Sequence, residues 1–145
     1  MPIKTKKVKA TTNNITKGIV SFLINRGHSA SRVNTTGIWD TKRKVFRTTG
    51  ARVGFYDIAC TIKTGIMLIG PGNIFPGRYL GVTLMIDTKR GRDSLSDEQK
   101  EFKAEIEEAG GVTFESENYN DFVDFYNNFL VQQFLLNGNE YHIEL

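Results

Sequence analysis

Residues 79–89 show the clearest structural pattern in the sequence, a strict alternation of side chains. One face of an extended chain would carry Val82, Leu84 and Ile86, and the other would carry Thr83, Met85, Asp87 and Lys89. This period of two predicts a β-strand that is buried on its apolar face. The strand restricts the chain to folds in which a sheet is covered by other layers.

The other patterned segments supply the remaining elements. Helices are expected at residues 14–26, from Ser96 to Gly110, and at residues 121–136. Strands are expected at residues 28–34, 55–62, 66–69 and 112–115, with a turn at 63–65 and a loop at 70–77. Residues 35–52 fit either a mobile loop or an irregular hairpin. The order predicts a basic tail at residues 1–12 and one α/β or α+β domain at residues 13–145, with a mixed sheet flanked by helices.

Charge is divided unequally along the 145 residues. Residues 1–92 hold 17 of the 19 lysines and arginines but only 3 of the 16 acidic residues, so the net charge of +3 conceals a basic part and an acidic part. Clustered cations attract polyanions, and nucleic acid is the leading candidate. The charges alone are equally consistent with two parts that neutralise each other in the fold.

Nothing in the sequence predicts a membrane span or a secretory signal. No apolar run approaches the roughly 18 residues that a span requires, so a soluble, intracellular protein is expected. Cys60 is the only cysteine, which excludes an internal disulfide and predicts a buried, reduced thiol. His28 stands alone after the first predicted helix and is expected to be structural or at the surface.

Two acidic residues within apolar strands are the candidates for chemistry. Asp87 and Lys89 would share a face of one strand, roughly 7 Å apart, and an adjacent strand pairing would bring Asp57 beside Asp87. Buried carboxylates are costly unless they are paired or bind a metal. Two carboxylates and a backbone carbonyl suit Mg²⁺ or Mn²⁺, which with a nearby ammonium can serve phosphodiester hydrolysis. A buried Asp–Lys ion pair explains the same pattern without catalysis.

The residues around this motif resemble the virus-type replication-repair nuclease (VRR-NUC) domain of the PD-(D/E)XK nuclease superfamily. The resemblance extends from about Asn14 to Phe129. Its matching stretches are Arg26-Gly27-His28, Arg32-Val33-Asn34 with Gly37, Gly54-Phe55-Tyr56-Asp57, Met85-Ile86-Asp87-Thr88-Lys89, Gly91-Arg92-Asp93-Ser94-Leu95-Ser96, Gln99-Lys100-Glu101-Phe102 and Ala109-Gly110-Gly111. A D…(D/E)xK pattern alone recurs by chance, but the SxxQxxF and AGG stretches that follow make it fairly specific.

The resemblance implies a restriction-endonuclease-like core of helix, three strands, helix and strand. It implies that Asp57, Asp87 and the Thr88 carbonyl bind Mg²⁺ or Mn²⁺, and that Lys89 orients the attacking water. Gln99 would support this site, and it also fits a capping box with Ser96. Two positions depart from the family. Asp87 stands where Glu is usual, and the first helix lacks the Glu that many members use for metal.

Basic and aromatic residues surround the predicted site. The residues expected to bind DNA phosphates are Arg32, Lys42, Arg43, Lys44, Arg47 and Arg52 before Asp57, and Arg90 and Arg92 after the catalytic strand. The alternative for the first set is a solvated charged surface. Trp39 and Phe46 would either anchor the loop onto the fold, which is the preferred interpretation, or stack on unpaired bases.

Together these features predict a metal-dependent DNA endonuclease. The resemblance implies selectivity for branched DNA, such as a four-way junction or a flap, in phage-type replication, recombination or repair. Symmetric junction cutting would need two sites, so a homodimer is expected, with the aromatic C-terminal helix as a candidate interface. The alternative is an inactive DNA-binding or recombination accessory protein on a nuclease-derived fold. A third possibility is a structural protein that self-associates through its two charged halves.

Overall fold

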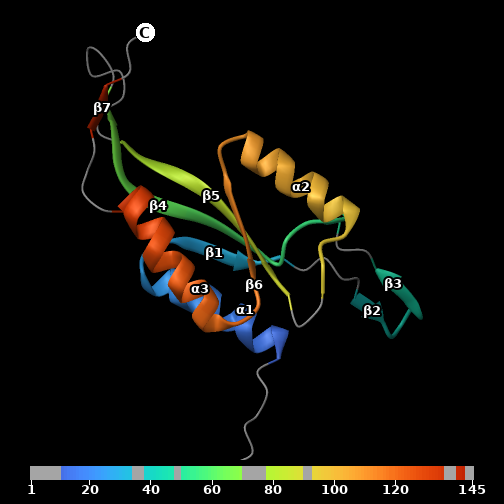
Figure 1. Cartoon of the computed structure of the whole chain (residues 1–145). Helices are drawn as coiled ribbons and strands as arrows, with labels where there is room; N and C mark the ends of the chain where they lie inside the picture. Colours follow the sequence, from blue (N-terminus) through green and yellow to red (C-terminus); the bar gives the residue numbers. More distant parts are fainter. Residues whose placement is uncertain are drawn as a thin grey trace, which may run out of the picture.

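A mixed β-sheet lies between layers of helix (Figure 1). The computed structural model describes residues 11–33, 38–47, 50–69, 78–89, 93–135 and 140–142. In chain order its elements are α1 (Thr12–Asn25), β1 (Ser29–Arg32), β2 (Ile38–Asp40), β3 (Val45–Arg47), β4 (Ile58–Ile69), β5 (Arg78–Thr88), α2 (Asp97–Glu108), β6 (Val112–Ser116), α3 (Tyr119–Phe125), the π-helix η2 (Tyr126–Leu135) and β7 (Glu140–His142).

The order of strands in the sheet is β1-β4-β5-β6, and β7 pairs with the far part of β4. The pairs β1–β4 and β4–β5 are antiparallel, whereas β5–β6 and β4–β7 are parallel. The predicted α/β class with a mixed sheet and flanking helices is therefore confirmed. Within the part of the chain that the structure describes, no helix is long and apolar enough to cross a membrane.

The alternation predicted for β5 is confirmed by the two cores of the protein. On one face α1, α3 and η2 cover alternate residues of the central strands, Ile58, Cys60, Ile62, Val82, Leu84 and Ile86. On the other face α2 brings Phe102 against Met85 and Tyr56 (Figure 1). Cys60 is buried as expected, and burial raises the pKa of its thiol to about 12.

Several predicted boundaries need correction. Thr11 caps α1 through its side chain and Thr12 begins the helix, so these two residues do not belong to a tail, and residues 1–10 lie outside the described residues. The last helix begins at Tyr119, after an Asn118 cap, and widens into a π-helix at Tyr126. The short strand β7 was not predicted, and the expected loop at residues 70–77 lies outside the described residues.

The turn predicted at residues 63–65 is wrong, because β4 continues through it to Ile69. The pairing with β5 shifts between Lys63 and Met67, as in a β-bulge. The Thr64 hydroxyl donates to the Leu80 carbonyl at 2.5 Å and accepts from the Ile66 N–H at 3.1 Å. This side chain therefore replaces backbone bonds lost at the irregularity, and the chain does not reverse direction there.

His28 is buried where α1, β4 and η2 meet, which confirms its structural role. The Lys63 N–H donates to Nδ1 at 3.1 Å, so this nitrogen is unprotonated. The proton is therefore on Nε2, which lies 2.8 Å from the Tyr126 hydroxyl. Burial lowers the pKa of His28, and the nearby Arg26 lowers it further.

We predict that the stability contributed by His28 is lost as the pH falls. The folded-state pKa lies below the unfolded value, so this stability is full above about pH 6.5 and declines below it. The variant His28→Asn keeps an acceptor for Lys63 but cannot take up a proton. In urea unfolding, the stability advantage of the wild type over His28→Asn should narrow between pH 7.5 and pH 5. A constant difference would contradict a neutral, buried imidazole.

Candidate active site

The carboxylates of Asp57 and Asp87 meet where the β4–β5 pair ends. Ile58 lies opposite Ile86 in this pair, which places the two aspartates next to each other one position further along. The predicted strand at 55–62 placed Asp57 within the strand. In the structure Asp57 directly precedes β4, which begins at Ile58. The sequence argument nevertheless correctly predicted that adjacent strands bring the two acids together.

A close contact between Gly54 and α2 determines how the chain enters this site. Gly54 has a φ of +86°, and a Cβ at this position would lie 2.5 Å from the backbone carbonyl carbon of Glu98. Only glycine combines this conformation with this approach without strain. The chain can therefore pass directly against the first turn of α2 before it reaches Tyr56 and Asp57.

Hydrogen bonds from Thr88 hold the carboxylate of Asp57 in place. Oδ2 of Asp57 accepts from the Thr88 N–H and from the Thr88 hydroxyl, both at 2.8 Å. The Thr88 hydroxyl oxygen also lies 3.2 Å from that of Thr16, on α1. The residue that follows Asp87 in the motif thus links β5 to both Asp57 and the first helix.

Asp87 is a buried carboxylate with one unsatisfied oxygen. Its residue is 2% exposed, and Oδ1 accepts from Nε2 of Gln99 at 3.2 Å. The Lys89 ammonium lies 2.8 Å from Oδ2, but Oδ2 has no hydrogen-bond partner within the described residues. Burial raises the pKa of Asp87 to about 6; Lys89 opposes this rise and the nearby Asp57 adds to it.

Gln99 occupies both positions that the sequence predicted for it. Its backbone N–H donates to the Ser96 hydroxyl and its Oε1 accepts from the Ser96 N–H, each at 3.2 Å, which completes the capping box of α2. The same Oε1 accepts from Nζ of Lys89 at 2.9 Å. One amide therefore caps the helix, orients the ammonium and binds the carboxylate of Asp87.

A second polar cluster lies beside this site on the α2 face of the sheet. Glu115 of β6 is in register with Asp87. The Tyr56 hydroxyl donates to Oε1 of Glu115 at 2.8 Å, and the Lys103 ammonium contacts the same oxygen at 3.1 Å. Burial and this hydrogen bond raise the pKa of Tyr56, so the phenol is neutral and serves as a donor.

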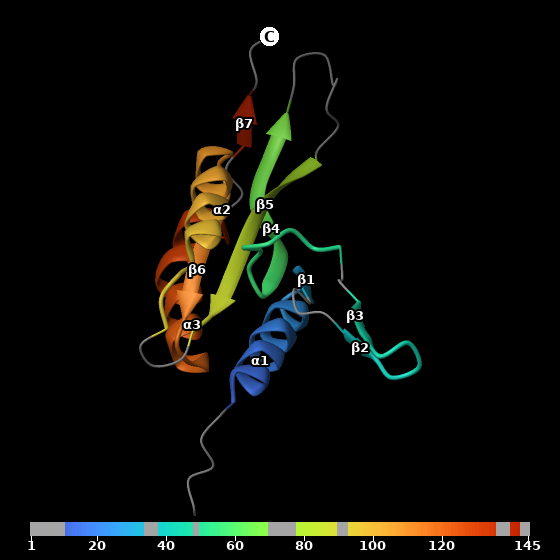
Figure 2. The same cartoon turned by 90° about the vertical axis from the view of Figure 1, so that its right-hand side faces the viewer.

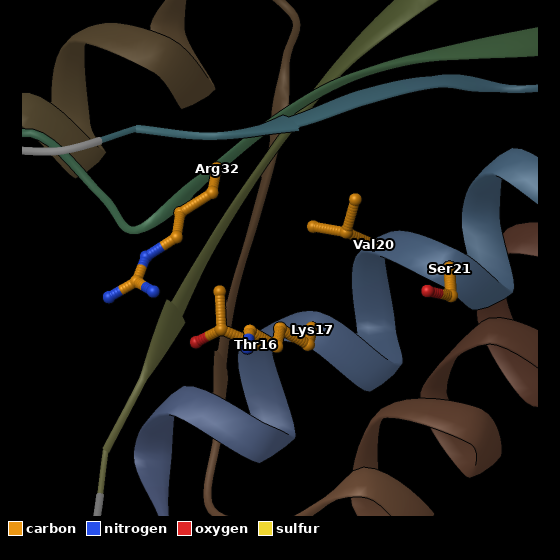
Figure 3. A pocket seen from close by; sticks show the side chains of 5 residues that line it. All are labelled: Thr16, Lys17, Val20, Ser21 and Arg32. Carbon is orange, nitrogen blue, oxygen red and sulfur yellow. The ribbon is translucent and has the colours of Figure 1, made fainter.

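An open pocket of about 270 Å³ lies against the outer side of the site. Its lining is mostly polar and consists of Thr12, Asn13, Thr16, Arg32, Asp57, Thr88 and Asp93. Thr16 and Arg32 also line a neighbouring pocket of about 250 Å³, where they meet Lys17, Val20 and Ser21 (Figure 3). Figure 3 shows that Arg32, from β1, forms one wall of this pocket and that the four α1 residues form the other. Sequence reasoning assigned no role to Thr16 or Asp93, although Asp93 is the first acid after the Asp87 motif.

The residues expected to bind phosphate do not form a single surface. Arg32 lines both pockets, whereas Lys42, Arg43, Lys44 and Arg47 belong to the β2–β3 hairpin. Arg52 forms a two-pronged ion pair with Glu105 of α2, at 2.5 and 2.7 Å. Arg90 and Arg92 lie outside the described residues.

The donor set suits a hard divalent cation. The unsatisfied oxygen of Asp87 and the adjacent carboxylate of Asp57 are anionic oxygen ligands, and Mg²⁺ typically binds one or two carboxylates and keeps several waters. No group of three or more His, Cys, Asp or Glu side chains converges within the described residues. Two carboxylates, the Thr88 carbonyl and water are thus the ligands that this end of the sheet would offer.

Comparison of the chain with protein-family models, with curated protein sequences and with solved structures gives no match in any of the three. A function must therefore be argued from the site and not from kinship.

We predict that Asp87 destabilises the metal-free protein at neutral pH. Its folded-state pKa of about 6 exceeds the ordinary 3.8, so the charged form is disfavoured in the fold above pH 6 and protonation relieves this cost as the pH falls. In urea unfolding with EDTA, the free energy of unfolding of Asp87→Asn at pH 8 should exceed that of the wild type by up to about 3 kcal/mol. The difference should vanish toward pH 4.

The matched control is Asp124→Asn, which makes the same change at an exposed position of α3. Its stability should follow the wild type at both pH values. If Asp87→Asn is no more stable than the wild type at pH 8, Lys89 fully compensates the burial of the carboxylate.

Proposed function

We propose that this protein is a metal-dependent DNA endonuclease of the VRR-NUC type, which hydrolyses phosphodiester bonds at the Asp57–Asp87 site. The observation that carries the proposal is the buried Asp87 carboxylate. One of its oxygens lacks a hydrogen bond although it lies beside Lys89 and a second carboxylate. Such a group is costly unless a ligand completes it.

A purely structural ion pair accounts less well for this arrangement. The Lys89 ammonium lies 2.8 Å from Oδ2 of Asp87, and Gln99 bonds both the ammonium and Oδ1, yet the pKa of Asp87 stays raised to about 6. Asp57 moreover places a second carboxylate against the pair, which raises the pKa of Asp87. A divalent cation held by Asp57 and Asp87 would offset this repulsion between the two carboxylates.

The order of elements also supports the proposal. With the β2–β3 hairpin set aside, the chain runs α1, β1, β4, β5, α2, β6. This is the order of helix, three strands, helix and strand that the resemblance implies for a restriction-endonuclease-like core. Asp57 and Asp87 come from adjacent strands, and Gln99 comes from the helix that follows.

The chemistry divides between the ligands and the side chains around them. A cation held by Asp57, Asp87 and the Thr88 carbonyl would acidify water and neutralise phosphate charge. Gln99 holds the Lys89 ammonium at the site, where it can orient water and stabilise the negative charge that develops on the phosphate. Arg32, in the adjacent pocket, provides a cation for a neighbouring phosphate. Selectivity for branched DNA and a homodimeric assembly complete the proposal, and both come from the resemblance.

One observation favours the second candidate, an inactive DNA-binding accessory protein. The segment Thr12–Asn25 of α1 contains no acidic residue. The α1 residue that reaches the site is Thr16, whose hydroxyl bonds to Thr12 and contacts Thr88. An accessory protein would bind DNA in a salt-sensitive manner and would not cut it.

A nicking assay tests the two candidates. Purified protein with Mn²⁺ or Mg²⁺ should cut at least one member of a panel of linear, flap and four-way-junction DNAs. Asp87→Ala and Lys89→Ala should each reduce cutting by about 100-fold or more, while DNA binding persists. The controls Asp124→Ala and Lys100→Ala alter charge at exposed positions and should retain activity. Binding without cutting on every substrate would favour the accessory protein.

Metal binding can be measured without turnover. Because only the folded protein presents both carboxylates, saturating Mn²⁺ should raise the melting temperature of the wild type by several degrees. Asp57→Asn and Asp87→Asn should lose this increase, and Asp124→Asn should keep it. An equal increase in all four proteins would place the metal elsewhere.

A further inference from the structure

We propose that the β2–β3 hairpin, residues 38–47, is a separate DNA-binding element that receives unpaired bases. Trp39 and Phe46 would stack on the bases while the cations of the turn contact the adjoining phosphates. The choice of DNA as the polymer rests on the proposed function. The geometry of the hairpin is observed independently of that function.

The first observation is the exposure of the two aromatic side chains. Trp39 is 51% and Phe46 is 68% exposed, so neither anchors the hairpin in a core, and the preferred sequence interpretation is wrong. The two residues are direct partners across the hairpin, with ring centroids 5.4 Å apart and planes inclined at 63°. They form one continuous aromatic surface, with faces available to a flat ligand.

The second observation is that the hairpin holds its own turn. Oδ1 of Asp40 accepts from the backbone N–H groups of Lys42 and Arg43 at 3.0 and 3.1 Å. Its other oxygen pairs with Nε of Arg47 at 2.9 Å. The only acid of the hairpin is thus used for internal bonds, so that it organises the turn and neutralises one of the four cations.

The remaining three cations are free to meet a polyanion. Lys42, Arg43 and Lys44 are exposed, and none has an acidic partner among the residues that the structure describes. Lys44 has a φ of +51°, a left-handed conformation in which glycine would be less strained. The turn thus carries an ammonium at a position with a left-handed backbone, two residues before Phe46.

Cations beside exposed aromatic rings match the chemistry of a single strand of nucleic acid. Aromatic side chains stack on bases of any sequence, and lysine and arginine follow the backbone. In a duplex the base faces are already stacked on each other, so this surface requires unpaired bases. A branched or flapped substrate contains both duplex DNA and unpaired bases.

The position of the hairpin agrees with such a role. Figures 1 and 2 both show β2 and β3 standing away from the sheet, toward the end of the molecule (the lower half of both views) at which β5 ends. Asp87 and Thr88 lie at that end of β5. An unpaired strand held by the hairpin would therefore lie toward the same end of the molecule as the candidate active site.

Trp39 is the only tryptophan of the chain, so its fluorescence reports directly on the hairpin. The full chain would be titrated in EDTA, which prevents cutting, with blunt duplex, the same duplex with a single-stranded arm, single-stranded DNA and RNA of the same sequence. We expect quenching by the armed duplex and by single-stranded DNA, and little quenching by the blunt duplex. Equal quenching by blunt duplex, or tighter binding of RNA than of DNA, would overturn the assignment.

Variants separate stacking from general attraction. Phe46→Leu should weaken binding of the armed duplex by about fivefold or more. Trp39→Leu should do the same, measured by anisotropy because this variant has no tryptophan fluorescence. Tyr79→Leu is the matched control, since Tyr79 is 54% exposed on β5, and it should bind as the wild type does. Lys44→Gly removes a charge while it relaxes the turn, so it should weaken binding and reduce the salt dependence without loss of stability.

The outcomes also separate this inference from the proposed function. If the wild type cuts DNA but Phe46→Leu and Tyr79→Leu bind alike, the hairpin inference fails and the nuclease stands. If quenching and the Phe46→Leu effect are found but no substrate is cut, the hairpin binds DNA on a non-catalytic protein. Circular dichroism confirms that each variant is folded.

Discussion

The site depends on one buried carboxylate at the end of a central strand. Asp87 cannot be hydrated where it lies, so its charge must be balanced by neighbours, and two segments supply them. Lys89 directly follows the same strand and Gln99 comes from the first turn of α2, whereas Asp57, the residue before β4, adds a second negative charge. A shift of Lys89 or Gln99 would leave the buried anion without a partner.

Much of this arrangement could be predicted because it is local in sequence. The alternation in residues 79–89 fixes which side chains share a face of β5, and the spacing of Ser96 and Gln99 defines a helix cap. What could not be predicted depends on contacts between distant residues. At the irregularity in β4 the Thr64 hydroxyl donates to the Leu80 carbonyl of β5, a contact that the turn-like composition of 63–65 does not reveal. The exposure of Trp39 likewise depends on where the hairpin stands, which its composition does not encode.

The division of charge along the sequence is partly resolved in the fold. Arg52 reaches across to Glu105, so some basic residues of the first part do neutralise the acidic helix α2. Lys103 is one of the few cations of the acidic part, and it serves Glu107 and Glu115. The hairpin cations and Arg32 have no such partner in the acidic part within the described ranges. The two interpretations of the charge pattern therefore apply to different residues. Internal neutralisation occurs around α2, and cations without an acidic partner lie on the β2–β3 hairpin and, separately, at Arg32.

Gly54 gives the site a property that none of its charged residues could provide. The backbone at this position touches the backbone of Glu98, with no side chain between them. Asp57 follows three residues later on one side of the contact, and Gln99 follows Glu98 directly on the other. The segment that leads to Asp57 and the first turn of α2 are therefore in direct backbone contact. A larger residue at position 54 would push the chain before Asp57 away from α2, and the spacing between Asp57 and Gln99 would change with it.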